Sequence, residues 1–121
     1  MSALSDLERA VLGAIALQLP EIAEAIALQQ EDIRVLAREN TGAGFYTTLE
    51  SISGPPIIGV ASPVGDVGAS IQGLDLGMGF VLWLKNDRLY QLEGYSYDES
   101  TNELDFEHLK FASVSPRASK A

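Results

Sequence analysis

The chain contains no cysteine, and this absence excludes disulfides, thiolate nucleophiles and zinc sites built on sulfur. His108 is the sole histidine, so no histidine pair exists to hold a metal ion; we expect it to be exposed beside Glu107 and not catalytic. A Gly-x-Ser-x-Gly segment, which surrounds the nucleophile of many serine hydrolases, is also missing. The sequence therefore predicts no catalytic residue, no metal site and no cofactor. A chain without cysteine is typical of a reducing compartment, and we expect a cytoplasmic protein.

Long apolar runs and basic residues are scarce too. Residues 11–19 are apolar, but acidic residues precede them and Pro20 follows, so they resemble neither a signal peptide nor a membrane span of roughly 20 residues. Eight basic residues stand against seventeen acidic ones, which gives a net charge of −9. Because this charge repels phosphate and anionic lipid, neither nucleic acid nor a membrane is expected as a partner. A basic protein would suit it; alternatively, the acidity only maintains solubility.

The chain length of 121 residues suits one domain. Ser5 and Glu8 have the spacing of a capping box, in which each side chain binds a backbone amide at the start of a helix. Apolar residues follow at helical spacing, and Pro20 ends one helix and begins the next. Two helices are expected, at residues 5–19 and 20–30.

From residue 33 the apolar residues alternate with polar ones, a period that indicates strands. Strands are expected at residues 33–38, 45–49, 67–74, 78–85, 88–97 and 111–114, with a short helix or an edge strand at 104–109. The sequence therefore predicts an α+β fold, with two N-terminal helices packed on a curved, mainly antiparallel sheet of about five or six strands. Residues 1–121 would form a single domain, with the helices at 5–30, the sheet at 32–115 and a flexible tail at 116–121.

The clearest local pattern is a hairpin at residues 78–97. Asn86 and Asp87 tolerate the positive φ angles that a two-residue type I′ turn requires. A regular ladder from this turn places certain residues opposite each other: Leu84 and Leu89, Trp83 and Tyr90, Val81 and Leu92, Phe80 and Glu93, and Gly79 and Gly94. The hairpin would then be central in the sheet, and a ring such as that of Phe45 would fill the space above the two glycines.

Two segments, residues 42–49 and 77–84, share Gly-x-Gly-Phe followed by an apolar strand. A strand follows where a phosphate site needs a helix, so these glycines indicate close backbone approach instead. Arg-Glu-Asn-Thr-Gly-Ala-Gly-Phe at residues 38–45 and Leu-Glu-Gly-Tyr at residues 92–95 resemble a family of small, uncharacterised bacterial α+β proteins, which share Arg-Glu-x-Thr-Gly-x-Gly-Phe and Leu-Glu-Gly-aromatic segments. The resemblance covers about residues 30–98, with mild departures at Asn40 and Tyr46. It implies a common fold and no catalytic residues.

Glu93 is a candidate site residue, because the expected register places its carboxylate on a largely apolar face. Such a carboxylate must find a partner or raise its pKa. In one interpretation Glu93 pairs with Arg34 or Arg38 and fixes the order of the strands. In the other it anchors a small polar ligand, or serves as a general base, in a pocket between helices and sheet. That pocket would be lined by Arg38, Glu93, Tyr95 and Tyr97.

Residues 89–109 carry six acidic side chains and no Lys or Arg. The spacing of an EF-hand calcium loop is absent. A basic protein partner suits this run, with Asp98, Glu99, Glu103 and Asp105 as the contact residues; alternatively, the run is a solvated edge that discourages sheet-to-sheet association. Another hypothesis is a homo-oligomer that buries the apolar segment 55–60.

These observations favour a non-enzymatic protein-interaction module, for instance an immunity-like protein that masks a basic partner. The alternative is a small polar ligand binder or an enzyme with a pocket around Arg38 and Glu93.

Overall fold

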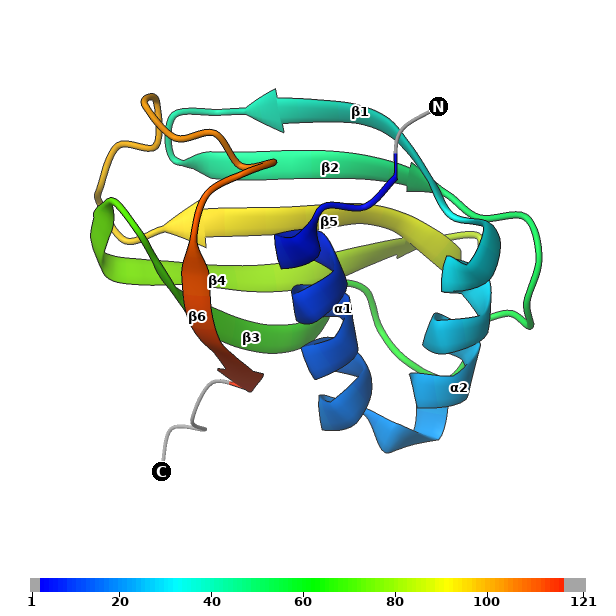
Figure 1. Cartoon of the computed structure of the whole chain (residues 1–121). Helices are drawn as coiled ribbons and strands as arrows, with labels where there is room; N and C mark the ends of the chain where they lie inside the picture. The colour runs from blue at the N-terminus through cyan, green and yellow to red at the C-terminus, as the bar shows by residue number, and fades with distance from the viewer. Residues whose placement is uncertain (1–2, 117–121) are drawn as a thin grey trace.

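The computed structural model describes residues 3–116, which form two α-helices, one 3₁₀ turn and six strands (Figure 1). The elements in chain order are α1 (Asp6–Gln18), α2 (Pro20–Gln29), η1 (Gln30–Asp32), β1 (Arg34–Asn40), β2 (Gly44–Glu50), β3 (Val64–Ile71), β4 (Leu74–Lys85), β5 (Arg88–Ser96) and β6 (Phe111–Pro116). Both predicted helices are confirmed to within a residue or two at each end. The predicted tail falls almost entirely outside the described residues.

The first helix begins where the sequence predicts. The Ser5 hydroxyl accepts a hydrogen bond from the Glu8 amide, and the Glu8 carboxylate accepts one from the Ser5 amide at 2.7 Å. The capping box is therefore confirmed, and α2 starts with Pro20 in its first turn.

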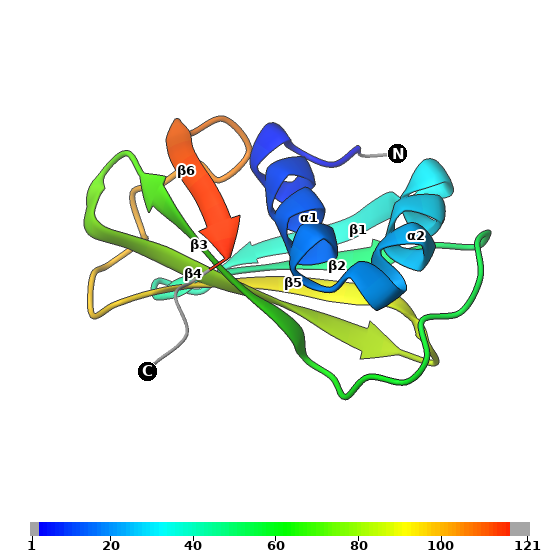
Figure 2. The same ribbon diagram turned by 90° about the horizontal axis from the view of Figure 1, so that it is seen from below.

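The six strands form one antiparallel sheet in the order β1-β2-β5-β4-β3-β6. The hairpin of β4 and β5 is central, as predicted, and β1 and β6 are the edges. Both helices cover the same side of the sheet, and the sheet curls so that β6 lies beside α1 (Figures 1 and 2). This arrangement confirms the α+β fold. Neither helix within residues 3–116 is both long and apolar enough to span a membrane.

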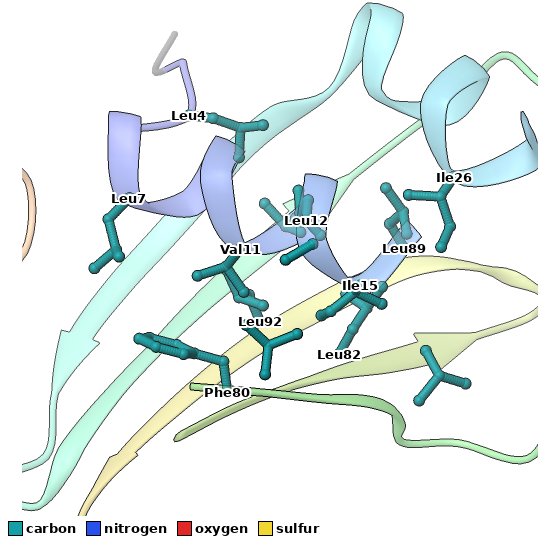
Figure 3. Packing of buried hydrophobic residues seen from close by; sticks show 14 of the residues in the cluster. Leu4, Leu7, Val11, Leu12, Ile15, Ile26, Phe80, Leu82, Leu89 and Leu92 are labelled. Atoms are coloured by element: carbon teal, nitrogen blue, oxygen red, sulfur yellow. The ribbon is translucent and has the colours of Figure 1, made fainter. Parts of the chain in front are cut away.

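The hydrophobic core lies between the helices and this side of the sheet, which we call the helix face. Figure 3 shows Val11, Leu12 and Ile15 of α1 directed toward Phe80, Leu82 and Leu92 of the central hairpin. All six side chains are completely withdrawn from solvent. Burial of this apolar surface is the main force that holds α1 on the sheet.

The hairpin turn is confirmed, but the register beyond it differs from the prediction. Asn86 and Asp87 have φ angles of 55° and 62°, as a type I′ turn requires. Leu84 lies opposite Leu89, and the register then shifts by one residue because Tyr90 forms a bulge in β5.

The predicted pairs beyond that bulge are consequently wrong. Trp83 lies opposite Gln91, and Glu93 lies opposite Val81 on β4. The shift has a simple cause: Leu89 and Leu92 are three residues apart, so they can both face the core only if one residue between them bulges.

The two glycines of the hairpin do not face each other, yet each is covered by an aromatic ring. A Cβ atom on Gly94 would meet the Phe45 ring at 2.4 Å, so Phe45 fills the space above this glycine. A Cβ atom on Gly79 would meet the Tyr95 ring at 2.4 Å. Phe45 is buried in the core, whereas Tyr95 is only half-buried.

Residues 97–110, which join β5 to β6, contain turns and neither the helix nor the strand predicted for 104–109. Thr101 ties this connection to the β1–β2 turn, because its buried hydroxyl accepts a hydrogen bond from the Gly44 amide at 3.0 Å and donates one to Asn40 at 2.9 Å. In the apolar segment 55–60, Ile57 is buried and Ile58 is exposed. The homo-oligomer through this segment stays a prediction.

Candidate functional site

The side of the sheet opposite the helices, which we call the open face, carries a group of half-buried aromatic side chains. Figure 2 shows that neither helix of the described chain lies on this side. The open face is formed by alternate, half-buried residues of the three inner strands β2, β5 and β4: Tyr46, Thr48, Val81, Trp83, Gln91, Glu93 and Tyr95. Tyr90, at the bulge, is half-buried at the same site.

Glu93 holds two of these aromatic side chains in place. The Trp83 indole N–H donates to Glu93 Oε1 at 2.9 Å, and the Tyr46 hydroxyl donates to Oε2 at 3.4 Å. Tyr46 is directly opposite Glu93 in the ladder, so all three residues belong to one small cluster on β2, β5 and β4. These hydrogen bonds fix the orientation of both rings.

The Glu93 carboxylate also affects the ionisation of Tyr46. The negative charge of Glu93 raises the pKa of the Tyr46 hydroxyl; partial burial and the hydrogen bond to Glu93 add to this effect, as does the charge of Glu39. Tyr46 therefore lies within reach of two carboxylates.

A shallow pocket of about 380 Å³ adjoins this cluster. It is lined by Tyr46, Trp83, Leu84, Lys85, Tyr90 and Gln91. The Lys85 ammonium lies 5.1 Å from the centre of the Tyr90 ring, in a cation–π contact. Tyr90, the bulged residue at which the observed register departs from the predicted one, lines this pocket.

Arg38 lies on the other side of the sheet. Its strand position is opposite Thr47, and both side chains bind Glu8 of α1 on the helix face. Because adjacent residues of a strand point to opposite faces, Thr47 and Arg38 are separated by the sheet from Tyr46 and Glu93. The predicted pocket that joins Arg38 to Glu93 is therefore not formed, and Tyr95 and Tyr97 contact each other instead, with ring centres 5.7 Å apart.

The predicted ion pairs of Glu93 are also wrong. Arg34 lies 4.0 Å from Glu50, and Arg38 binds Glu8 through two hydrogen bonds of 2.9 and 2.8 Å. No Lys or Arg within residues 3–116 forms an ion pair with Glu93.

Among the acidic residues of the described part of the chain, Glu8 is the buried one, with 3% of its surface exposed. Burial raises the pKa of its carboxyl, but hydrogen bonds from Arg38, the Ser5 amide and Thr47 outweigh burial and leave the pKa below its ordinary value. The local sequence predicts only the capping-box role of Glu8. Its second partner, Arg38, is 30 residues away in the chain and could not be inferred from local spacing.

The four predicted partner-binding acids are not equivalent. The Glu99 carboxylate accepts hydrogen bonds from the backbone amides of Asp75 and Leu76. The Asp105 carboxylate accepts one from the backbone amide of Glu107 and lies 2.9 Å from Nδ1 of the His108 ring. Asp98 and Glu103 are exposed. His108 is exposed as predicted, and Asp105 raises the pKa of its ring.

The sequence does not predict the surface cluster of Tyr46, Trp83 and Tyr90, because a regular ladder places Trp83 opposite Tyr90 and directs Glu93 to the other face. One pattern could have indicated it. Gln91 and Glu93 alternate with Leu92 and Gly94 along the strand. Two polar side chains on one face indicate that water reaches this face, so other residues on the same face should also be accessible to water. Comparison of the chain with protein-family models, with curated proteins and with solved structures found no match.

Proposed function

We propose that this chain is a non-enzymatic protein-interaction module that binds a basic protein partner on its open face. One observation carries the proposal: Trp83 and Tyr46 are half-exposed on an uncovered sheet and are held there by Glu93. Trp and Tyr are the residues that most often dominate binding energy at protein interfaces, because they bury a large rigid surface at small entropic cost.

The charge of the chain supports a basic partner. The net charge is −9, and Glu93 and Glu39 both lie close enough to Tyr46 to raise the pKa of its hydroxyl. A partner of opposite charge is attracted over a distance and gains specificity on contact. The exposed Asp98 and Glu103 extend the same field along the chain beyond β5.

Affinity capture with matched variants tests the proposal. The immobilised chain is incubated with an extract of its native cell at low salt, and bound proteins are released at high salt. We expect a basic protein that binds the wild type and is lost with Trp83→Ala and with Tyr46→Ala.

Leu17→Ala is the control, because Leu17 is 82% exposed on α1 and its truncation removes apolar surface from the helix layer instead. Circular dichroism verifies that each variant is folded. Retention of every salt-released protein by Trp83→Ala, or equal loss with Leu17→Ala, would exclude the open face as the binding surface.

A further inference from the structure

The carboxylate of Glu93 lies on the open face, and no Lys or Arg within residues 3–116 forms an ion pair with it. Both of its hydrogen-bond donors, the Trp83 indole and the Tyr46 hydroxyl, are neutral. Glu8, in contrast, is matched by the guanidinium of Arg38. Each carboxylate oxygen of Glu93 accepts one of these bonds and retains further acceptor capacity, so a cation arriving from outside can still bind it.

The pocket beside this carboxylate has aromatic walls. Tyr46, Trp83 and Tyr90 contribute rings to a space of about 380 Å³, which is sufficient for one long side chain. Aromatic faces attract cations, and the Lys85 ammonium already lies over Tyr90. Glu93 does not line this pocket, but it binds Trp83 and Tyr46, which do, so its negative charge lies next to two of the aromatic walls.

We propose that this pocket receives an arginine side chain of the basic partner, with its guanidinium against Tyr46 and Trp83 and paired with Glu93. The inference rests on the proposed function and specifies its central contact. Arginine fits better than lysine because its planar, weakly hydrated guanidinium stacks on rings and forms two parallel bonds to a carboxylate. An apolar side chain would leave the charge of Glu93 uncompensated in the interface.

Trp83 is the only tryptophan of the chain, so its fluorescence reports this pocket directly. The probes are three tripeptide amides, acetyl-Gly-X-Gly-NH₂, in which X is arginine, lysine or citrulline. Citrulline has nearly the shape of arginine without its charge. We expect a saturable change with the arginine peptide at millimolar concentration, and binding of the citrulline peptide that is roughly tenfold weaker or absent.

Glu93→Gln should weaken binding of the arginine peptide roughly tenfold. The substitution removes the charge of the side chain but keeps an oxygen that can accept the hydrogen bond from the Trp83 indole. Glu24→Gln, the same change at an exposed position of α2, should have no effect. Lys85→Met should strengthen binding about twofold, because Lys85 places a like charge at the pocket. Affinities are compared from titration midpoints, with folding verified by circular dichroism.

Equal binding of the citrulline or the lysine peptide, no saturable response, or an unchanged affinity in Glu93→Gln would each overturn the arginine assignment. These results are separable from the capture experiment. If Trp83→Ala loses the partner while the peptides fail, the docking surface remains and its central contact is not arginine. If Trp83→Ala retains the partner, the docking surface itself is wrong.

Discussion

Glu8 and Glu93 are both partly or wholly withdrawn from water, and their neighbours give them different roles. Glu8 meets a guanidinium, a hydroxyl and an amide, so its charge and its hydrogen-bonding capacity are both used inside the protein. Glu93 meets two neutral donors and retains an unbalanced charge on the open face. The first glutamate therefore has its charge neutralised within the fold, and the second is the one that the proposed partner would contact.

Arg38→Met tests the structural role of the buried pair. The substitution leaves the Glu8 carboxylate buried without its cation, so we expect the free energy of unfolding to fall by about 3 kcal/mol. Chemical denaturation measures this change. Arg34→Met is the matched control on the same strand, because the Arg34–Glu50 pair is half-exposed and 4.0 Å apart; its loss should cost less than about 0.5 kcal/mol. Equal effects of the two substitutions would contradict the role given to Arg38.

The lowered pKa of Glu8 predicts a dependence of stability on pH. A carboxyl whose pKa is lower in the folded than in the unfolded state stabilises the fold above the unfolded value, here about 4.5, and this contribution is lost as the pH falls through the folded value. Glu8→Gln lacks the titrating group. The difference in unfolding free energy between wild type and Glu8→Gln should therefore shrink below about pH 4.5. Urea denaturation from neutral to acidic pH measures it; a constant difference would exclude Glu8 as the source.

At the scale of elements, the central hairpin is the part that builds the open face. Its turn is local, but the bulge at Tyr90 shifts every later residue of β5 by one position. As a result Leu92 and Gly94 face the core, while Gln91, Glu93 and Tyr95 join Trp83 on the other side. A hairpin without this bulge would direct Glu93 toward α1.

The two glycines of the hairpin provide a test of which face is packed. Gly94→Ala places a methyl group against the buried ring of Phe45 and against Met78, so we expect a loss of about 1–3 kcal/mol in unfolding free energy. Gly79→Ala meets the far end of the half-buried Tyr95, which can move toward solvent, and should cost less.

Gly13→Ala is the control for this pair. An added Cβ at Gly13 meets no atom within 4 Å, and alanine favours the helix, so stability should rise by about 0.5–1 kcal/mol. Thermal or chemical denaturation of the three variants supplies the comparison. A larger loss for Gly79→Ala than for Gly94→Ala would mean that the open face is the more tightly packed side.

At the scale of the whole molecule, both helices of residues 3–116 cover one face of a six-stranded sheet, and neither covers the other face. The helices bury Leu7, Val11, Leu12, Ile15, Ile22 and Ile26 in the core, whereas the open face presents half-buried rings and the carboxylate of Glu93. The net charge of −9 produces a negative electrostatic field around the molecule, which acts at longer range than any of these contacts.

This charge should accelerate association with the proposed partner. Asp98→Asn combined with Glu103→Gln removes two exposed charges and should slow association about twofold at low salt, with unchanged stability. Stopped-flow mixing with the captured protein measures the rate. Glu21→Gln with Glu24→Gln is the control, because it removes the same charge from exposed positions of α2. Equal slowing by both pairs would show that net charge, and not its placement near the hairpin, determines the rate.

Local chemistry determined much of this protein from its sequence. The capping box at Ser5 and Glu8 starts α1, the proline at position 20 separates the helices, and Asn86 and Asp87 reverse the chain. Each of these features depends on residues within a few positions of one another, so spacing alone is sufficient to predict it. The α+β fold follows from the change of apolar period after η1.

Only the tertiary structure decided which face each strand residue occupies and which charge each carboxylate meets. The bulge at Tyr90 exists because Leu89 and Leu92 must both reach a core that α1 completes from the other end of the chain. Arg38 binds Glu8, and not Glu93, because the sheet separates Arg38 from Glu93 and α1 covers the side on which Arg38 lies. Such pairings join residues 30 or more positions apart, and they depend on the order of the packed layers, which no local spacing encodes.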